Sequence, residues 1–134
     1  AYTWNRFTYD TVTTITGETY SGTWLPNSPA NLAYLDVELR PQAHWVLGVG
    51  AEYQSRSYID PSNTVWTDPY NLVNLRAAYQ CQGKSHHGEV FGIVRNLLDT
   101  KYIAFTEPDP DGNSYHPGPP REAFLGVRVW LDTL

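Results

Sequence analysis

The sequence alternates between strand-like stretches and connections whose lengths switch between long and short. Six stretches show the two-residue alternation of a β-strand, and none shows helical periodicity with end caps. They cover residues 2–9, 32–40, 45–53, 70–79, 90–98 and 123–131. The connections run to about twenty, four, sixteen, ten and twenty-two residues. This spacing predicts an all-β fold, an antiparallel up-and-down meander of about six strands.

The order of the connections predicts where they lie. In an antiparallel meander, alternate connections lie at opposite ends of the sheet. The long connections, 10–29, 54–69 and 99–120, are therefore expected at one end and the short ones at the other. Outer-membrane barrels have this asymmetry, with short periplasmic turns and long extracellular loops. A soluble β-barrel or sandwich that binds an apolar ligand, with or without self-association, remains the alternative.

The closing strand has two very different faces. One face would carry only aliphatic side chains: Ala123, Leu125, Val127, Val129 and Leu131. The other would carry Phe124, Gly126, Arg128 and Trp130. The aliphatic face must either cover a core or contact lipid, and the strand by itself does not decide between them.

Composition excludes several classes of protein. The chain has 134 residues, the length of one ordinary domain, and a net charge of −5, which argues against nucleic-acid binding. Its single cysteine, Cys81, leaves no internal disulfide possible. No apolar run approaches the roughly 18 residues of a membrane-spanning helix, whereas a strand of a membrane barrel needs only about ten alternating residues.

Four stretches in a fixed order carry a family resemblance. They are YQSRSYIDPSNT (53–64), PYNLVNLRAAY (69–79), NLLDTKY (96–102) and PGPPR (117–121). Together with the earlier TYSGTWLPNSPANLAYLDVELRP, they resemble the C-terminal β-barrel segment of a TonB-dependent outer-membrane receptor. The most specific of them, NLLDTKY, is similar to the family's Asn-Leu-x-Asp-x-x-Tyr at a strand end. The resemblance covers essentially residues 1–134.

The resemblance implies a transporter of the bacterial outer membrane. Such receptors are barrels of about 22 strands around an N-terminal plug. They take up scarce nutrients, such as ferric siderophores, haem or cobalamin, with energy delivered through TonB. Residues 1–134 would supply the last six strands and the outer loops of such a parent protein. Because the plug and the TonB-contacting segment would lie elsewhere, this segment would not transport alone.

Two departures from the family pattern bear on assembly. Family chains usually end on an aromatic residue, but Leu131 occupies that place and Asp132, Thr133 and Leu134 follow it. Six strands are also too few to close a barrel of the family's circumference. An isolated chain would therefore expose two sheet edges, and we expect it to self-associate as a homo-oligomer or small closed sheet.

The motif residues are expected to shape loops. Asn96 and Asp99 in NLLDTKY are expected to cap the strand end through bonds to the backbone. A similar loop-shaping role is expected for Tyr58, Asp60 and Asn63. Two further aromatic residues, Tyr102 and Tyr115, are candidates for the membrane-interface belt. Ligand contacts vary with the ligand in this family, so no ligand-binding residue is assigned.

No catalytic or metal site is expected. The acidic run with Glu107, Asp109 and Asp111 lacks the spacing of a calcium loop and is expected to be a solvated loop with a turn at Asp111-Gly112. His86 and His87 are adjacent on an expected turn, a poor arrangement for metal binding. The carboxylates Asp36 and Glu38 share a strand face that would line an aqueous lumen. With no catalytic motif, the chain is expected not to be an enzyme and to need no cofactor.

Overall fold

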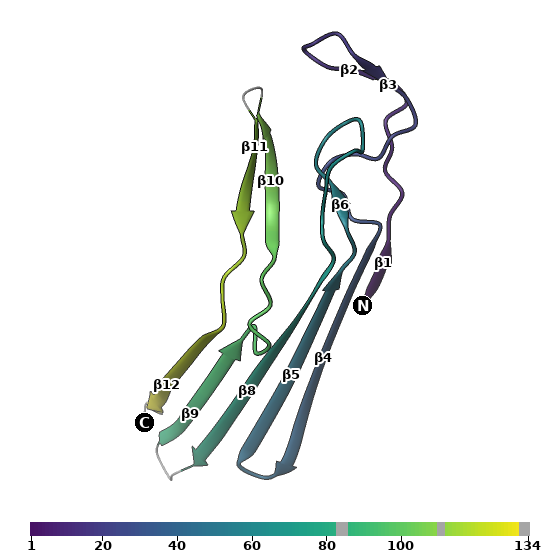
Figure 1. Ribbon diagram of the computed structural model, residues 1–134. Coiled ribbons are helices and arrows are strands. Elements are labelled where there is room, and N and C mark those ends of the chain that lie inside the picture. The colour runs from purple at the N-terminus through teal and green to yellow at the C-terminus, as the bar shows by residue number, and fades with distance from the viewer. Residues whose placement is uncertain (83–85, 110–111, 132–134) are drawn as a thin grey trace. The chain divides into compact units, whose positions relative to one another are not determined.

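The computed structural model describes residues 1–82, 86–109 and 112–131, and it is all-β (Figure 1). One antiparallel sheet has the strand order β1-β4-β5-β8-β9-β12. Its strands are β1 (Tyr2–Trp4), β4 (Asn31–Gln42), β5 (Trp45–Gln54), β8 (Tyr70–Gln82), β9 (His86–Arg95) and β12 (Glu122–Leu131). The predicted six-stranded meander is confirmed. Within the described residues, no helix is long and apolar enough to cross a membrane.

The long connections contain short hairpins that the sequence did not predict. The pairs are β2 (Val12–Thr13) with β3 (Thr19–Tyr20), β6 (Ser57–Tyr58) with β7 (Trp66–Thr67), and β10 (Ile103–Asp109) with β11 (Gly112–Pro117). In the last pair, six residue pairs align and a bulge separates Ile103 from Phe105. These segments escape pattern analysis because proline, acidic and small polar residues dominate their composition.

The first and fifth strands differ from the expected ranges. Regular pairing of β1 ends at Trp4 rather than residue 9, although single backbone bonds continue, from Asn5 N to Ala30 O (2.8 Å) and from Tyr9 N to Thr23 O (2.8 Å). The fifth strand starts earlier than expected, at His86. The expected turn at His86 and His87 is therefore wrong, because both residues belong to β9.

The remaining strands agree with the expected ranges to within three residues. A turn at residues 43 and 44 separates β4 from β5, and the link between β8 and β9 lies in residues 83–85, outside the described chain. The expected turn at Asp111-Gly112 and residues 132–134 also fall wholly or partly outside it. The fifth strand ends at Arg95 because Asn96 and Asp99 both adopt positive φ, 47° and 51°, which turns the chain out of the strand.

The chain divides into two compact units. We call the first the loop unit; it consists of Ala1–Ala33, Tyr53–Asn71 and Lys101–Gly118. The second, the sheet unit, consists of Tyr34–Glu52, Leu72–Thr100 and Pro119–Leu134. Each contains little buried apolar surface among the described residues: Val46, Leu72 and Ala78 in the sheet unit, and Ile59 in the loop unit.

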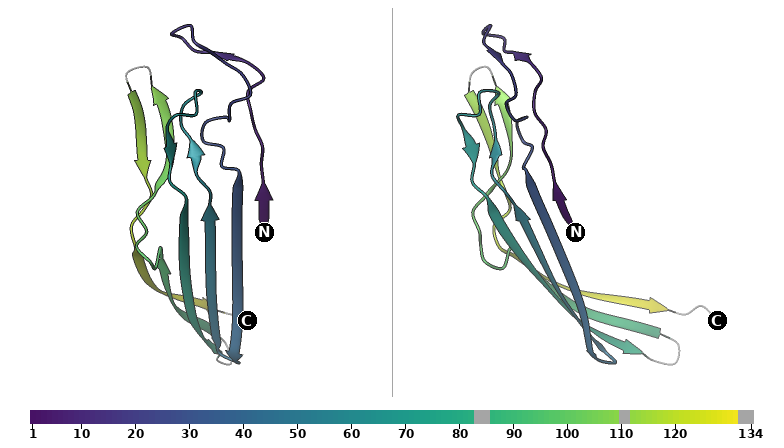
Figure 2. Two further views of the ribbon diagram at one scale, coloured as in Figure 1. Left: turned by 45° about the vertical axis from the view of Figure 1, so that its right-hand side comes forward. Right: turned by 90° about the vertical axis from the view of Figure 1, so that its right-hand side faces the viewer.

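In the sheet unit, β8, β9 and β12 lie side by side (Figure 2), and their register fixes which side chains share a face. Arg128 is paired with Glu89, which is paired with Gln80. On the opposite face, Tyr79 is paired with Val90, and Val90 with Val127. The sheet unit therefore has one face with ion-pairing side chains and one face of apolar side chains.

The apolar face is uncovered. Leu125 is 83% exposed and Val127 69% exposed. The ring contact between Trp45 and Tyr79, 5.1 Å between centroids, places the odd-numbered residues of β5 on this face as well. Its exposed members are Leu35, Val37, Leu39, Trp45, Leu47, Val49, Tyr79, Val90, Leu125, Val127 and Val129. An exposed apolar area of this extent is typical of a surface that contacts lipid or another chain.

Candidate functional site

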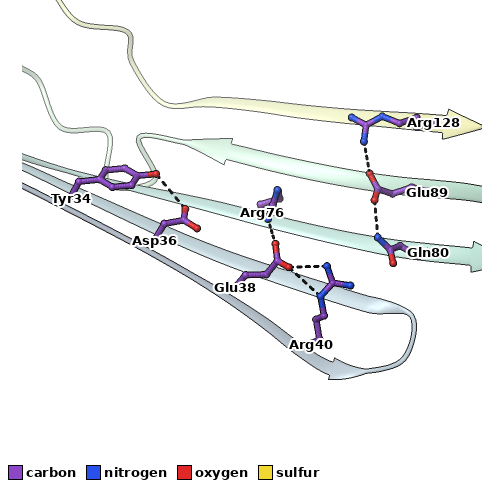
Figure 3. A network of polar contacts seen from close by, with 8 residues as sticks. All are labelled: Tyr34, Asp36, Glu38, Arg40, Arg76, Gln80, Glu89 and Arg128. Carbon is purple, nitrogen blue, oxygen red and sulfur yellow. Dashed lines mark hydrogen bonds and ion pairs between the residues drawn. The ribbon is translucent and has the colours of Figure 1, made fainter. Parts of the chain in front are cut away.

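The polar face of the sheet unit holds a first ion-pair cluster at β4 and β8 (Figure 3). The Glu38 carboxylate accepts hydrogen bonds from Arg40 Nε (3.2 Å) and Nη2 (2.9 Å) and pairs with Arg76 of β8. Its neighbour Asp36 accepts a hydrogen bond from the Tyr34 hydroxyl (3.4 Å). Both carboxylates are thus engaged by side chains of the same face.

A second cluster crosses β8, β9 and β12 (Figure 3). Glu89 accepts hydrogen bonds from Gln80 Nε2 (3.2 Å) and Arg128 Nη1 (3.1 Å). The Arg128 guanidinium also lies over the rings of Phe91 (5.2 Å) and Trp130 (5.5 Å). Only 13% of the Glu89 side chain is exposed, so the charge of Arg128 compensates a largely desolvated carboxylate.

Between the two clusters lies an open hollow of about 220 Å³, whose lining includes Arg40, Arg76, Glu89 and Arg128. Ion pairs between exposed side chains contribute only about 0–1 kcal/mol each. The Glu38 pairs, whose side chains are all more than a third exposed, therefore add little to the stability of the sheet. Together with the Glu89 pair, they line one face of the strands with charged side chains, a composition suited to the water-filled interior of a membrane barrel.

The NLLDTKY motif builds the turn after β9, as predicted. Asn96, 4% exposed, donates from its side-chain amide to the carbonyls of Thr100 (3.0 Å) and Pro119 (3.1 Å) and accepts from the Thr100 amide (2.9 Å). Asp99 accepts from the Arg121 amide (3.0 Å). Both side chains thus replace backbone partners where the strand ends, and their predicted capping role is confirmed.

Within the loop unit, the last residue of that motif packs tightly. The centroids of the Tyr102 and Tyr70 rings lie 4.5 Å apart. The backbone carbonyl of Tyr102 accepts a hydrogen bond from the Gly118 amide (2.9 Å). A Cβ atom at position 118 would overlap the Tyr102 ring, which explains the glycine. Tyr115 is half exposed on β11. Membership of both tyrosines in an interface belt stays a prediction.

The residues expected to shape the loop after β5 do so around one carboxylate. Asp60 accepts hydrogen bonds from the Ser62 hydroxyl, the Thr64 amide (3.2 Å) and hydroxyl (3.0 Å), and the Val65 amide (2.9 Å). Partial burial opposes ionisation of Asp60, but these donors outweigh it and lower the pKa of the carboxyl. Tyr58 contributes its backbone carbonyl to the loop structure, where it accepts from the Asn27 amide (2.9 Å).

Two asparagines with positive φ connect the three long loops within the loop unit. Asn63 (φ 59°) accepts from the Trp24 amide (2.6 Å) and donates to the Trp24 carbonyl (3.0 Å). Asn27 (φ 54°) donates to the Thr106 carbonyl (2.7 Å) and accepts from the Thr106 amide (3.2 Å) and hydroxyl (2.8 Å). Asn27 had no signal in the sequence beyond its type, because its partner is 79 residues away.

The acidic and histidine-bearing segments form no metal cluster where they are described. His116 Nε2 lies 3.4 Å from a Glu107 carboxylate oxygen. No three His, Cys, Asp or Glu side chains come close enough to hold an ion among the described residues. Of the three acids in the calcium hypothesis, Asp111 and the side chain of Asp109 lie outside them, as does the side chain of His86. Cys81 is a free, exposed thiol on β8.

Comparison with known proteins identifies the family. Residues 1–97 match the family model described as TonB dependent receptor-like, beta-barrel. The chain belongs to this family. Proteins of this family reside in the bacterial outer membrane and interact with TonB, so the parent protein of this chain is located in that membrane. The resemblance found in the sequence is thereby confirmed.

Two relatives are transporters of different cargoes. One is the vitamin B12 transporter BtuB of Photobacterium profundum, 35% identical over 72 residues that cover 54% of this chain and 11% of the relative. The other is the ferrichrome outer membrane transporter/phage receptor of Escherichia coli, 28% identical over 103 residues that cover 73% of this chain and 14% of the relative.

A solved structure has the same fold. The ferric citrate transporter FecA in its unliganded form superimposes with a TM-score of 0.71 and 22% identity, over 82% of this chain and 18% of FecA. The chain thus spans between about a tenth and a fifth of the length of these proteins.

Proposed function

We propose that residues 1–134 form one segment of the wall of an outer-membrane receptor that takes up a scarce nutrient of the siderophore, haem or cobalamin type. In this role the sheet unit supplies barrel wall, and the loops at 10–29, 54–69 and 99–120 supply part of the outer vestibule. The segment has no catalytic function. The plug and the TonB-contacting segment belong to other sequence of the same receptor, so the segment does not transport alone.

One observation supports this role above the others: the contrast between the two faces of the sheet unit. The face with Leu125, Val127 and Val129 is aliphatic and exposed, as expected for contact with lipid. On the other face, Glu38 and Glu89 pair with arginines beside an open hollow lined by charged side chains. A soluble sandwich would bury the aliphatic face instead. The relatives of this chain include a vitamin transporter and a ferrichrome transporter.

Uptake by cells tests the proposal. A strain that lacks the complete receptor gene is compared with the same strain carrying the gene on a plasmid, each supplied with radiolabelled ferric siderophores, haem or cobalamin. We expect uptake of at least one cargo only with the gene, and its loss when TonB is removed. Absence of uptake for every cargo, or recovery of the receptor outside the outer-membrane fraction, would contradict the proposal.

A further inference from the structure

An arginine of the loop unit lies over two aromatic rings at the β6–β7 hairpin. The Cζ atom of Arg56 is 5.7 Å from the centroid of Tyr58 and 5.8 Å from that of Trp66. Tyr58 and Trp66 are directly paired across the two strands, so their side chains share one face of the hairpin. Cation–π attraction holds the guanidinium near this face. We call Arg56, Tyr58 and Trp66 the loop cluster.

A second arginine with two rings shows what the loop cluster lacks. Arg128 lies over Phe91 and Trp130, and its charge is balanced by Glu89 at 3.1 Å. Arg56 has no such carboxylate among the described residues. The Arg56 guanidinium, the Tyr58 hydroxyl and the Trp66 indole N–H have no hydrogen-bond or ion-pair partner anywhere in the described ranges 1–82, 86–109 and 112–131. Three donors on one face are therefore available to an external acceptor.

The hairpin that carries the cluster is held in place from behind. Its opposite side is buried: Ile59 is 0% exposed, and Ser57 and Thr67 are also buried. The loop between the strands is fixed by the hydrogen bonds to Asp60 and by the paired bonds between Asn63 and Trp24. Trp66, in contrast, is 49% exposed. A ligand that binds this face meets side chains on a backbone already ordered, which reduces the entropy cost of binding.

The chemistry of the cluster specifies a class of ligand. A guanidinium and two further donors favour a group with negatively charged oxygens. The half-exposed indole of Trp66, beside the less exposed phenol of Tyr58, favours a flat ring next to it. We propose that the loop cluster binds an anionic ferric chelate with aromatic rings, of the catecholate type. This inference rests on the proposed uptake function and specifies the cargo for one part of the vestibule.

The loop unit as a whole carries a net negative charge. Acidic residues outnumber basic ones in that unit: Asp10, Glu18, Asp60, Asp68, Glu107, Asp109 and Asp111 against Arg6, Arg56 and Lys101. The net charge of this unit therefore does not attract an anion over a long range. Binding must come from direct contact with Arg56 and its two rings, so substitutions in the loop cluster should change the affinity strongly.

The test measures equilibrium binding by the complete receptor in detergent micelles, using three probes with radiolabelled iron. They are the ferric complex of 2,3-dihydroxybenzoate, which is anionic and aromatic; ferric citrate, which is anionic without a ring; and ferrichrome, which carries neither feature. We expect Arg56→Gln to weaken binding of the dihydroxybenzoate complex about tenfold, and Trp66→Leu about three- to tenfold, in line with charge-assisted and cation–π contacts. Ferrichrome binding, if present, should not change.

Matched variants separate a binding role from a folding role. Arg6→Gln removes an exposed arginine of the same unit outside the cluster and should leave all affinities unchanged. Arg56→Lys keeps the charge but loses the planar fork, and an intermediate affinity is expected. Equal weakening of all probes by Arg56→Gln would indicate a folding defect and overturn the inference.

Three further outcomes would overturn the inference. An unchanged affinity in Arg56→Gln, or no binding of the aromatic complex to the unmodified receptor, overturns the inference, while uptake of another cargo by cells would leave the proposed function intact. Phosphate groups of lipopolysaccharide are a second source of anionic oxygens. If Arg56→Gln reduces binding of purified lipopolysaccharide and not of the chelate, the loop cluster contacts the membrane surface and the inference is wrong.

Discussion

Backbone pairing dominates the sheet unit, whereas in the loop unit side-chain hydrogen bonds join the three long loops. In the sheet unit, β9 and β12 are paired without interruption from Glu122 opposite Arg95 to Leu131 opposite His86. In the loop unit, two asparagine side chains supply key links between segments far apart in sequence. A backbone ladder distributes stability over many residues, whereas an amide side chain concentrates it in one. Substitutions should therefore act through side-chain environment in the sheet unit and through single bonds in the loop unit.

The largest effect is expected from a charge placed on the apolar face of the sheet unit. Val127→Arg should destabilise the receptor in a bilayer by about 2–4 kcal/mol, because an arginine near the bilayer midplane must be desolvated. The matched change on the polar face, Gln80→Arg, places the same side chain beside Glu89 and should cost far less. Urea unfolding in liposomes measures the free energy of unfolding of both variants. Equal destabilisation by the two variants would mean that the faces do not differ in environment.

A smaller, local effect is expected from loss of one side-chain link in the loop unit. Asn27→Ala leaves the amide and carbonyl of Thr106 without their partners, which should cost about 1–3 kcal/mol. Hydrogen exchange should speed up in residues 103–109 and remain unchanged in the sheet unit. Asn113→Ala, which removes an exposed asparagine from β11, is the control. Faster exchange throughout the chain would show that the two units do not open separately.

The smallest effect concerns pH and Asp60. Because the folded-state pKa of this carboxyl lies below its unfolded value of about 3.9, its hydrogen bonds stabilise the loop above that pH. This contribution is lost as the pH falls through the folded pKa. Exchange of the Thr64 and Val65 amides, corrected for intrinsic rate, should therefore accelerate below about pH 4. Asp60→Asn should abolish that acceleration; if it persists in the variant, another group causes it.

The sheet was predictable because its signals are local. Alternation over about ten residues assigns β5 and β12, and NLLDTKY places Asn96 and Asp99 at a strand end. Strand ends were less certain. The Asn96 side chain takes over backbone hydrogen bonds where β9 ends at Arg95, and β9 starts at His86, where the expected pattern showed a turn. The link from Asn27 to Thr106 was not predictable, because nothing near Asn27 in the sequence indicates a partner in the third loop.

The amide links also divide the loops into positions that can and cannot be altered. Asn27 and Asn63 each use both an oxygen acceptor and a nitrogen donor on the same partner residue, so even aspartate, with the same shape, would lose half of each link. Exposed positions near them, such as Val65, supply no comparable pair of side-chain hydrogen bonds. A library designed to redirect the receptor to a new cargo should randomise those positions and keep both asparagines, so that variants differ in surface chemistry on one unchanged loop scaffold.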